Sequence, residues 1–271
     1  MLRSMYSGIS GMKGFQTKLD VIGNNIANVN TFGFKKGRVV FKDMVSQQIS
    51  GASAPLGTTR GGTNPRQVGL GSQLAAIDTM QTQGSTQTTY RTLDLAISGD
   101  GFFQVKDGTN TLYTRAGNFY LDKSGNLVTS DGLFVQGTTG TTTTVGNIVI
   151  PNPDTVKDLS IGADGKVTYT DAAGTLQTAG TIQLAKFPNP DGLMKVGGNL
   201  FEETPNSGAA TATIPGTGGA GTIVAGTLEM SNVDLSEEFT EMIVAQRGFQ
   251  ANTRIITTSD EILQELVNLK R

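Results

Sequence analysis

Two apolar stripes with helical spacing, one towards each end of the chain, constrain the fold more than any other feature of the sequence. The N-terminal stripe advances by three or four residues at a time, which is the spacing of a coiled-coil helix. Its members are Leu2, Met5, Ile9, Met12, Phe15, Leu19, Ile22, Ile26 and Val29. We predict a helix over residues 1–30 that weakens near Asn30, because Gly33 and Gly37 then interrupt the pattern.

The C-terminal stripe predicts a second long helix within residues 232–271. Asn232 and Asp234 are candidate N-caps, and Glu237 follows Asp234 at the spacing of a capping box. Acidic residues gather in the first two turns, where they favour the positive end of the helix dipole. The apolar positions expected to pack include Leu235, Phe239, Met242, Phe249, Ile256, Leu263 and Leu266.

Between the stripes the pattern changes to short segments with a period of two, separated by glycine turns. Hairpin turns are predicted at Asp107-Gly108, Ser124-Gly125-Asn126, Asp131-Gly132 and Asp164-Gly165. We therefore predict a mixed α and β fold, in which a mainly antiparallel β domain (73–231) is inserted between long terminal helices that pack as a coiled coil. Residues 31–72, rich in Ser, Gly and Thr, are expected to be an extended linker.

Composition excludes several kinds of function. The chain has 0 Cys, 0 His and 0 Trp, so it cannot build a Ser-His-Asp triad, a thiolate nucleophile or a Cys/His zinc site. A net charge of -2 argues against a nucleic-acid binder. No segment resembles a signal peptide or is apolar over a membrane-spanning length. We expect no enzymatic activity, no cofactor, no metal site and no stable membrane insertion.

The glycine-rich N-terminal stripe is a poor candidate for a helix that stands alone. Gly8, Gly11, Gly14 and Gly23 lie beside it, and each weakens an isolated helix. One hypothesis is that the two ends form an intramolecular hairpin. The other is that they stay mobile in the monomer and become ordered only when several copies stack. The N-terminal stripe has more basic than acidic residues and the C-terminal one more acidic than basic, which favours pairing between them.

Three ordered motifs carry a resemblance to a known family. They are Leu19–Lys35 (LDVIGNNIANVNTFGFK), the middle pair Leu93–Phe103 and Tyr113–Phe119 (YTRAGNF), and Ser231–Leu235 (SNVDL) followed by Met242–Arg247 (MIVAQR). Together they resemble the bacterial flagellar rod and hook family over essentially the whole chain. The motif residues singled out are Asn24, Asn25, Asn28, Thr31, Gly33, Phe34 and Asn232.

The resemblance implies a structural subunit that polymerises into a helical tube, with the terminal helices forming the inner coiled-coil layers and the β domain lying outside. Implied partners are copies of itself, other axial proteins (rod, hook cap, hook–filament junction) and the flagellum-specific type III export apparatus. The implied location is the flagellar hook or basal body, outside the cytoplasm, reached without a cleaved signal peptide.

Within the family, residues 185–200 and 246–252 look more like short hook proteins of Gram-positive bacteria, which favours a hook subunit, the flexible joint that transmits torque to the filament. The length matches the distal rod, a rigid drive shaft, which is the alternative. An extracellular carbohydrate-binding or carbohydrate-active β protein with incidental helical ends is a more distant alternative, as is an assembly chaperone.

Three local features remain. The segment 46–72 is expected to act either as a compliant tether or as a locking segment. The basic run Lys35, Lys36, Arg38 and Lys42 is expected to be a solvated face or to pair with acidic residues of a neighbouring subunit. Asp94 has no predictable partner.

Overall fold

The computed structural model describes residues 2–55, 61–139, 145–151, 153, 156 and 158–269. The chain divides into two compact units. The first unit contains Met1–Ala27, Gly37–Thr79 and Asp234–Arg271, and the second contains Asn28–Lys36 and Met80–Val233. Each unit is therefore assembled from segments that are far apart in the sequence, and each is described by itself below.

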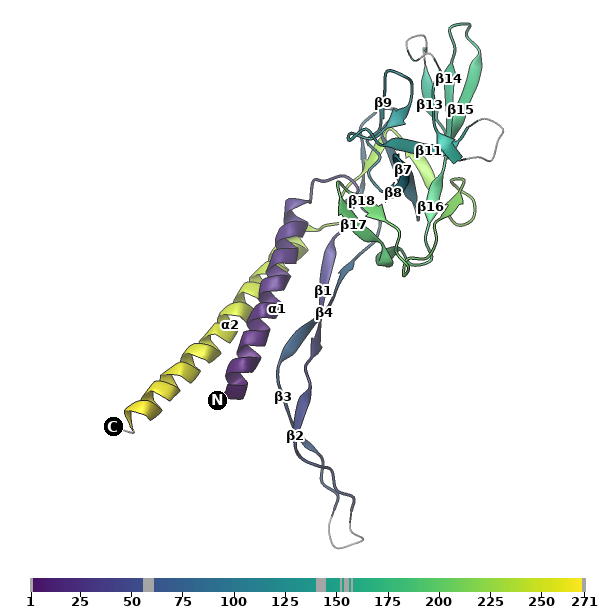
Figure 1. Ribbon diagram of the computed structural model, residues 1–271. Coiled ribbons are helices and arrows are strands. Elements are labelled where there is room, and N and C mark those ends of the chain that lie inside the picture. Colours follow the sequence, from purple (N-terminus) through teal and green to yellow (C-terminus); the bar gives the residue numbers. More distant parts are fainter. Residues whose placement is uncertain are drawn as a thin grey trace. The chain divides into compact units, whose positions relative to one another are not determined.

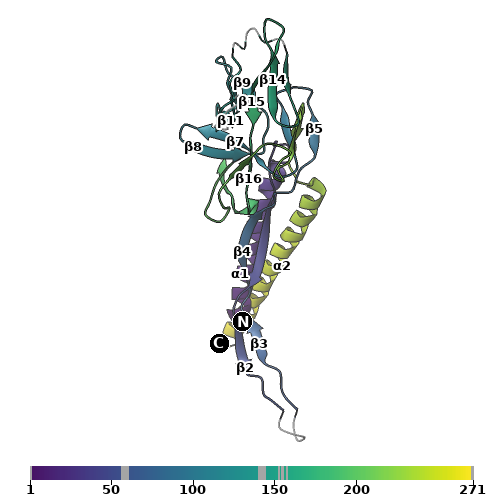
Figure 2. The same ribbon diagram turned by 90° about the vertical axis from the view of Figure 1, so that its right-hand side faces the viewer.

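The first unit contains a pair of helices, α1 (Leu2–Ala27) and α2 (Leu235–Asn268), which lie side by side and run antiparallel (Figures 1 and 2). Asp234 caps α2, because its carboxylate accepts hydrogen bonds from the backbone N–H groups of Ser236 (2.8 Å) and Glu237 (3.4 Å). α1 ends at Ala27, so the last member of the N-terminal stripe, Val29, lies in the turn that follows the helix.

A β-ribbon completes the first unit and corrects the expectation of an extended linker over 31–72. β1 (Gly37–Asp43) pairs antiparallel with β4 (Ser72–Thr79), and β2 (Ser46–Ser50) pairs with β3 (Arg66–Gly69). The ribbon contacts α1, with Phe41 against Gly14. The polar composition suggested an unpaired segment, but backbone hydrogen bonds between strands need no apolar pattern.

The second unit consists mainly of antiparallel strands. One large sheet has the order β13-β14-β15-β11-β7-β8-β18-β17, with β9, β10, β12, β16 and β19 attached to it, while β6 pairs β20 and β5 pairs β21. Their bounds are β5 (Thr86–Thr88), β6 (Leu95–Ser98), β7 (Phe102–Asp107), β8 (Asn110–Thr114), β9 (Tyr120–Leu121), β10 (Leu127–Val128), β11 (Phe134–Thr138), β12 (Val145–Asn147), β13 (Leu159–Ile161), β14 (Lys166–Thr170), β15 (Leu176–Ile182), β16 (Leu184–Lys186), β17 (Met194–Gly197), β18 (Leu200–Glu202), β19 (Thr211–Thr213), β20 (Thr222–Ala225) and β21 (Thr227–Glu229). The prediction of a mixed fold with a mainly antiparallel β region between two helices is confirmed.

The strand β7 divides the interior of this unit into two apolar clusters. Alternate side chains of a strand point to opposite faces of the sheet. Phe103 and Val105 accordingly join the larger cluster, whereas Phe102 joins a smaller, aromatic one. In the smaller cluster the Tyr113 and Phe187 rings meet edge to face, with 4.8 Å between centroids. The central strand is thus covered on both faces.

The glycine turns lie where the sequence predicted them. Asp107-Gly108 joins β7 to β8, Ser124-Gly125-Asn126 joins β9 to β10, Asp131-Gly132 joins β10 to β11, and Asp164-Gly165 joins β13 to β14, and every one of these strand pairs is antiparallel. Such turns are read from two or three adjacent residues, which is why the sequence locates them well. A short 3₁₀ turn, η2 (Pro190–Gly192), lies between β16 and β17.

Candidate assembly surface and the buried motif network

The contact between α1 and α2 relies on glycines that let the helices approach closely. Gly248 of α2 faces the Phe15 ring so tightly that a Cβ there would lie 2.5 Å from Phe15 Cζ. Nearer to the start of α1, Gly8 lies against Ile256. Lys18 Nζ and Glu241 Oε2 form an ion pair at 3.1 Å, which agrees with the expected charge complementarity. The stripes therefore meet within one molecule.

The pairing covers only part of the predicted stripes. Ile22 is buried, whereas Phe239 and Leu266 keep about half of their surface exposed (50% and 51%). Ile9 and Leu235 are also exposed. The remaining predicted positions are half-buried: Met5, Met12, Phe15, Leu19, Ile26, Val29, Met242, Phe249, Ile256 and Leu263. The side chain of Leu2 lies outside the described part of the chain.

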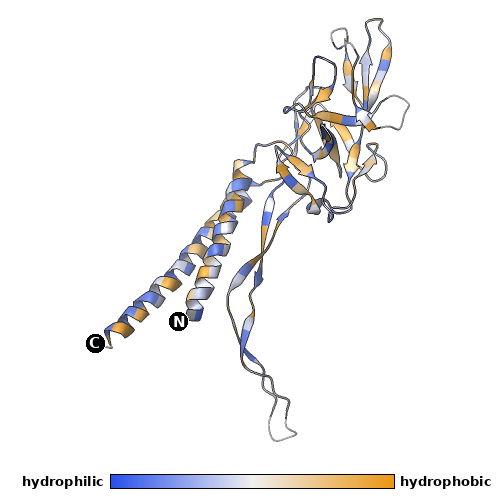
Figure 3. Cartoon of the chain, viewed as in Figure 1, coloured by the Kyte–Doolittle hydropathy of each residue, from blue (hydrophilic) through white to orange (hydrophobic). Residues whose placement is uncertain are grey.

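Further apolar side chains of the first unit lie open to solvent. On the helices they are Tyr6, Ile243, Val244, Ile255, Ile262 and Val267, and on the ribbon and its turns they are Val45, Ile49, Val68, Leu74 and Ile77. Figure 3 shows apolar positions along the length of both helices. Because exposed apolar side chains are so numerous in this unit, it is a candidate interaction surface. We call the exposed apolar side chains of α2 the outer α2 face; they are Leu235, Phe239, Ile243, Val244, Ile255, Ile262, Leu266 and Val267.

Asn25, from the first family motif, joins three elements of the first unit. Its side-chain Oδ1 accepts from Gly37 N–H and its Nδ2 donates to Gly37 O, both at 2.9 Å, so the amide mimics a strand partner for the start of β1. Nδ2 also lies 3.2 Å from the carboxylate of Glu238 on α2. Asn25 is only 2% exposed, so its hydrogen bonds are protected from water.

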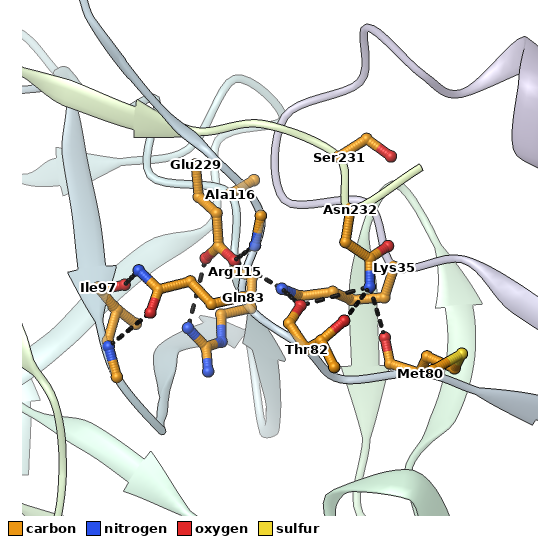
Figure 4. A network of polar contacts seen from close by, with 12 residues as sticks. Lys35, Met80, Thr82, Gln83, Ile97, Arg115, Ala116, Glu229, Ser231 and Asn232 are labelled. Carbon is orange, nitrogen blue, oxygen red and sulfur yellow. Dashed lines mark hydrogen bonds and ion pairs between the residues drawn. The ribbon is translucent and has the colours of Figure 1, made fainter. Parts of the chain in front are cut away.

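Asn232, from the last family motif, performs a similar role in the second unit and is not a helix cap. Its Oδ1 accepts from Lys36 N–H at 2.7 Å, and its Nδ2 donates to Met80 O and Thr82 Oγ1, each at 2.9 Å (Figure 4). One amide therefore ties the segment after α1, the segment after β4 and the segment before α2 together.

A buried charge cluster lies beside Asn232 (Figure 4). Lys35 Nζ is 2.6 Å from Glu229 Oε1 and donates to Thr82 O at 2.7 Å, while Arg115 Nη1 is 3.3 Å from Glu229 Oε2. The side chains of Lys35 and Glu229 are fully buried. Burial lowers the pKa of Lys35 and that of Arg115, and the Glu229 carboxylate opposes both shifts. The expectation that Lys35 belongs to a solvated basic face is wrong.

The other motif residues shape the turn that carries Lys35. Gly33 has φ +69, and a Cβ there would meet Ala116 N at 2.6 Å, so a side chain is excluded by both conformation and space. Thr31 Oγ1 donates to Asn28 Oδ1 at 3.1 Å, and Phe34 is buried beneath the Lys195 ammonium. Asn24 lies exposed on α1.

Lys35 and Arg115 stand inside two of the motifs, but the sequence predicted no partner for either within the same chain. Glu229 lies two residues before the third motif, so the cluster brings all three motifs together. The order of the three motifs along the chain was the one signal that the sequence offered. It does not predict which residues pair, because the paired residues come together only when the chain folds. Asp94, which had no predictable partner, pairs with Arg91 at 3.0 Å.

The described residues offer little for metal or membrane chemistry. They contain no group of three or more Asp or Glu side chains placed to hold a metal ion. In the same part of the chain, neither helix combines the length and the apolar character that a membrane span requires.

Comparison with known proteins agrees with a chain that has helical ends and a β region between them. Three family models match: "Flagella basal body rod protein" over residues 5–35, "Flagellar hook protein FlgE/F/G D1 domain" over 96–169, and "Flagellar basal body rod FlgEFG protein C-terminal" over 224–269. The matched segments carry α1 with the Lys35 turn, the central strands with Arg115, and Glu229 with α2.

Full-length relatives point the same way. The chain is 63% identical to the flagellar basal-body rod protein FlgG of Bacillus subtilis and 40% identical to that of Borreliella burgdorferi. It is 34% identical to the flagellar hook protein FlgE of Borreliella burgdorferi, and all three matches cover 100% of both chains. These relatives are structural proteins and not enzymes. The chain belongs to the family of flagellar rod and hook axial proteins.

Proposed function

We propose that the chain is a subunit of the flagellar basal-body rod, of the distal type, and that it polymerises into a rigid tubular shaft. The sequence motifs favoured a hook subunit, but the identity to rod relatives supports the alternative. The rod relatives align over 272 and 276 residues, close to the 271 of this chain, whereas the hook relative needs an alignment of 442 residues.

The β-ribbon supports a stiff subunit. A shaft that transmits torque must resist sliding between its parts, whereas a hook must permit it. Within 46–72, the strands Ser46–Ser50 and Arg66–Gly69 pair with each other, and the neighbouring strands β1 and β4 contact α1. The ribbon therefore fits the locking role better than the tether role.

The outer α2 face supports self-association. Polymers with helical symmetry use heterologous contacts, in which one surface of a subunit meets a different surface of the next. The first unit offers apolar side chains on α2 and a second set on the ribbon, so it carries two candidate surfaces. In this proposal the helices and ribbon form the inner layers of the tube, and other axial proteins and the flagellar export apparatus are further partners.

Polymerisation is tested by replacing Phe239 and Ile243 together with serine. Both are exposed (50% and 59%), so the monomer should keep its circular dichroism spectrum and melting temperature. We expect the fraction that sediments on ultracentrifugation to fall at least about tenfold, because two apolar contacts of about 1–2 kcal/mol each disappear. Leu176→Ser, at a 73% exposed position of β15, is the matched control and should sediment normally. Equal sedimentation of all three proteins would refute this role for the outer α2 face.

The choice between rod and hook is tested by electron microscopy of the polymer. A rod subunit should give straight tubes under all conditions of pH and ionic strength in which tubes persist. Tubes that curve or change curvature with those conditions would support the hook and contradict the proposal.

A further inference from the structure

A pocket in the second unit is not used by anything described so far. It has a volume of about 220 Å³ and is lined by residues from the ends of β7, β8 and β16 and from the segment before β5. Phe102, Phe187 and Pro188 form apolar walls. Apolar side chains lower the local dielectric constant, so electrostatic interactions in the pocket are stronger than in water.

Arg115 lines this pocket and retains unused hydrogen-bonding capacity. Its side chain is 3% exposed and contacts Glu229 only through Nη1. Arg115 Nε is buried and has no hydrogen-bond partner among the residues that the structure describes. A buried donor left without a partner costs free energy comparable to a lost hydrogen bond, so such a donor calls for an acceptor.

Gln81, which also lines the pocket, shows the same feature. Neither its Nε2 nor its Oε1 has a partner within the described part of the chain, and both atoms are buried. Lys186 adds an ammonium group to the lining, where its Nζ also donates to Gly219 O at 3.3 Å. The residues that line the pocket thus include a guanidinium, an amide and an ammonium group among their side chains.

The charge balance around the pocket is positive. Lys35 and Arg115 carry two positive charges against the one carboxylate of Glu229. Among the pocket residues, Lys186 and Asp100 contribute one charge of each sign. These five groups carry a net charge of +1, and Arg115 is buried whereas Asp100 is exposed, which favours an anion over a cation or a neutral group.

We propose that this pocket binds a carboxylate group. A carboxylate is planar and accepts hydrogen bonds on two oxygens, which matches the geometry of a guanidinium N–H edge and an amide N–H. The group is supplied either by an acidic side chain of a second copy of this chain or by a small free carboxylic acid. Both sources share the same recognition by Arg115, Gln81 and Lys186.

The first experiment uses the full-length, unpolymerised protein with acetate as the probe. The Arg115 Nε–Hε group gives its own NMR signal, assigned through Arg115→Lys. At constant pH and ionic strength we expect acetate, and not chloride, to shift this signal in a saturable manner. Gln81→Met should weaken acetate binding about tenfold, since a hydrogen bond to a charged group disappears. Lys186→Met should also weaken it, and Lys123→Met, at an exposed lysine of the same unit, should not.

The second experiment identifies the source and rests on the proposed polymerisation. If a neighbouring subunit supplies the carboxylate, Gln81→Met and added acetate should each raise the concentration of protein left in the supernatant after sedimentation. If a free acid is the ligand, both should leave sedimentation unchanged, and acetate should still bind within the polymer. The proposal is overturned if acetate shifts the Arg115 signal no more than chloride does, whatever the polymerisation assay gives.

Discussion

The two units of this molecule differ in how far they bury their apolar side chains. The second unit encloses many of its apolar side chains in two clusters and also buries charged ones, among them Lys35, Arg115 and Glu229. The first unit pairs its helices and ribbon yet leaves much of α2 apolar and exposed. A closed β body is stable by its own contacts, whereas an open helical surface gains most of its stability from neighbours. One chain thus combines a self-sufficient part with a part built for association.

Removing the shared carboxylate should give the largest effect. Glu229→Gln keeps the shape of the side chain but leaves the charges of Lys35 and Arg115 uncompensated in a buried site. We expect the free energy of unfolding of the second unit to fall by about 3–5 kcal/mol. The measurement is urea unfolding followed by near-ultraviolet circular dichroism, with Glu202→Gln at an exposed position of β18 as the control. A loss below about 1 kcal/mol would mean that the cluster contributes little.

Replacing a glycine with alanine should change the free energy of unfolding in opposite directions in the two units. Gly117→Ala in the second unit would place a Cβ 1.7 Å from the backbone oxygen of Leu95, so the backbone must move, at a cost of about 1–3 kcal/mol. Gly23→Ala on α1 meets nothing within 4 Å and should stabilise the helix by up to about 1 kcal/mol. Thermal unfolding of both variants checks this prediction. If Gly117→Ala is neutral, the second unit is less tightly packed than described.

The smallest expected effect concerns pH and again belongs to the closed unit. Burial, together with the nearby Glu203 carboxylate, raises the pKa of Tyr113 to about 12 from about 10. The folded chain therefore keeps the phenol proton where the unfolded chain has lost it. Holding this proton stabilises the folded state. The stabilisation is fully present below pH 10 and is lost as the pH rises towards 12.

Tyr113→Phe removes that contribution and isolates it. We expect the variant to be less stable than the original protein by about 1 kcal/mol at pH 7, and the difference to shrink between pH 10 and pH 12. Urea unfolding at several pH values provides the measurement. A constant difference over the whole range would show that the phenol proton is not held by the folded state.

Local patterns in the sequence predicted a good part of the fold. The helices follow from apolar spacing, Asp234 from its capping position, and four hairpins from adjacent turn residues. The ribbon was not predicted because β1 and β4 pair residues 29 to 42 positions apart with no apolar alternation to mark them. The Lys35–Glu229 pair joins residues 194 positions apart, and a lysine within a basic run is more often solvated. Such pairings depend on the closed fold and not on neighbouring residues.

The Lys35–Arg115–Glu229 cluster also determines when, during synthesis of the chain, the second unit can finish folding. Its carboxylate comes from near the C-terminal end of the second unit, whereas its two cations come from much earlier in the chain. During synthesis, both cations emerge from the ribosome long before their counterion. The β body therefore reaches its final, closed state only after Glu229 has emerged, and most of the second unit is synthesised while this interior is incomplete.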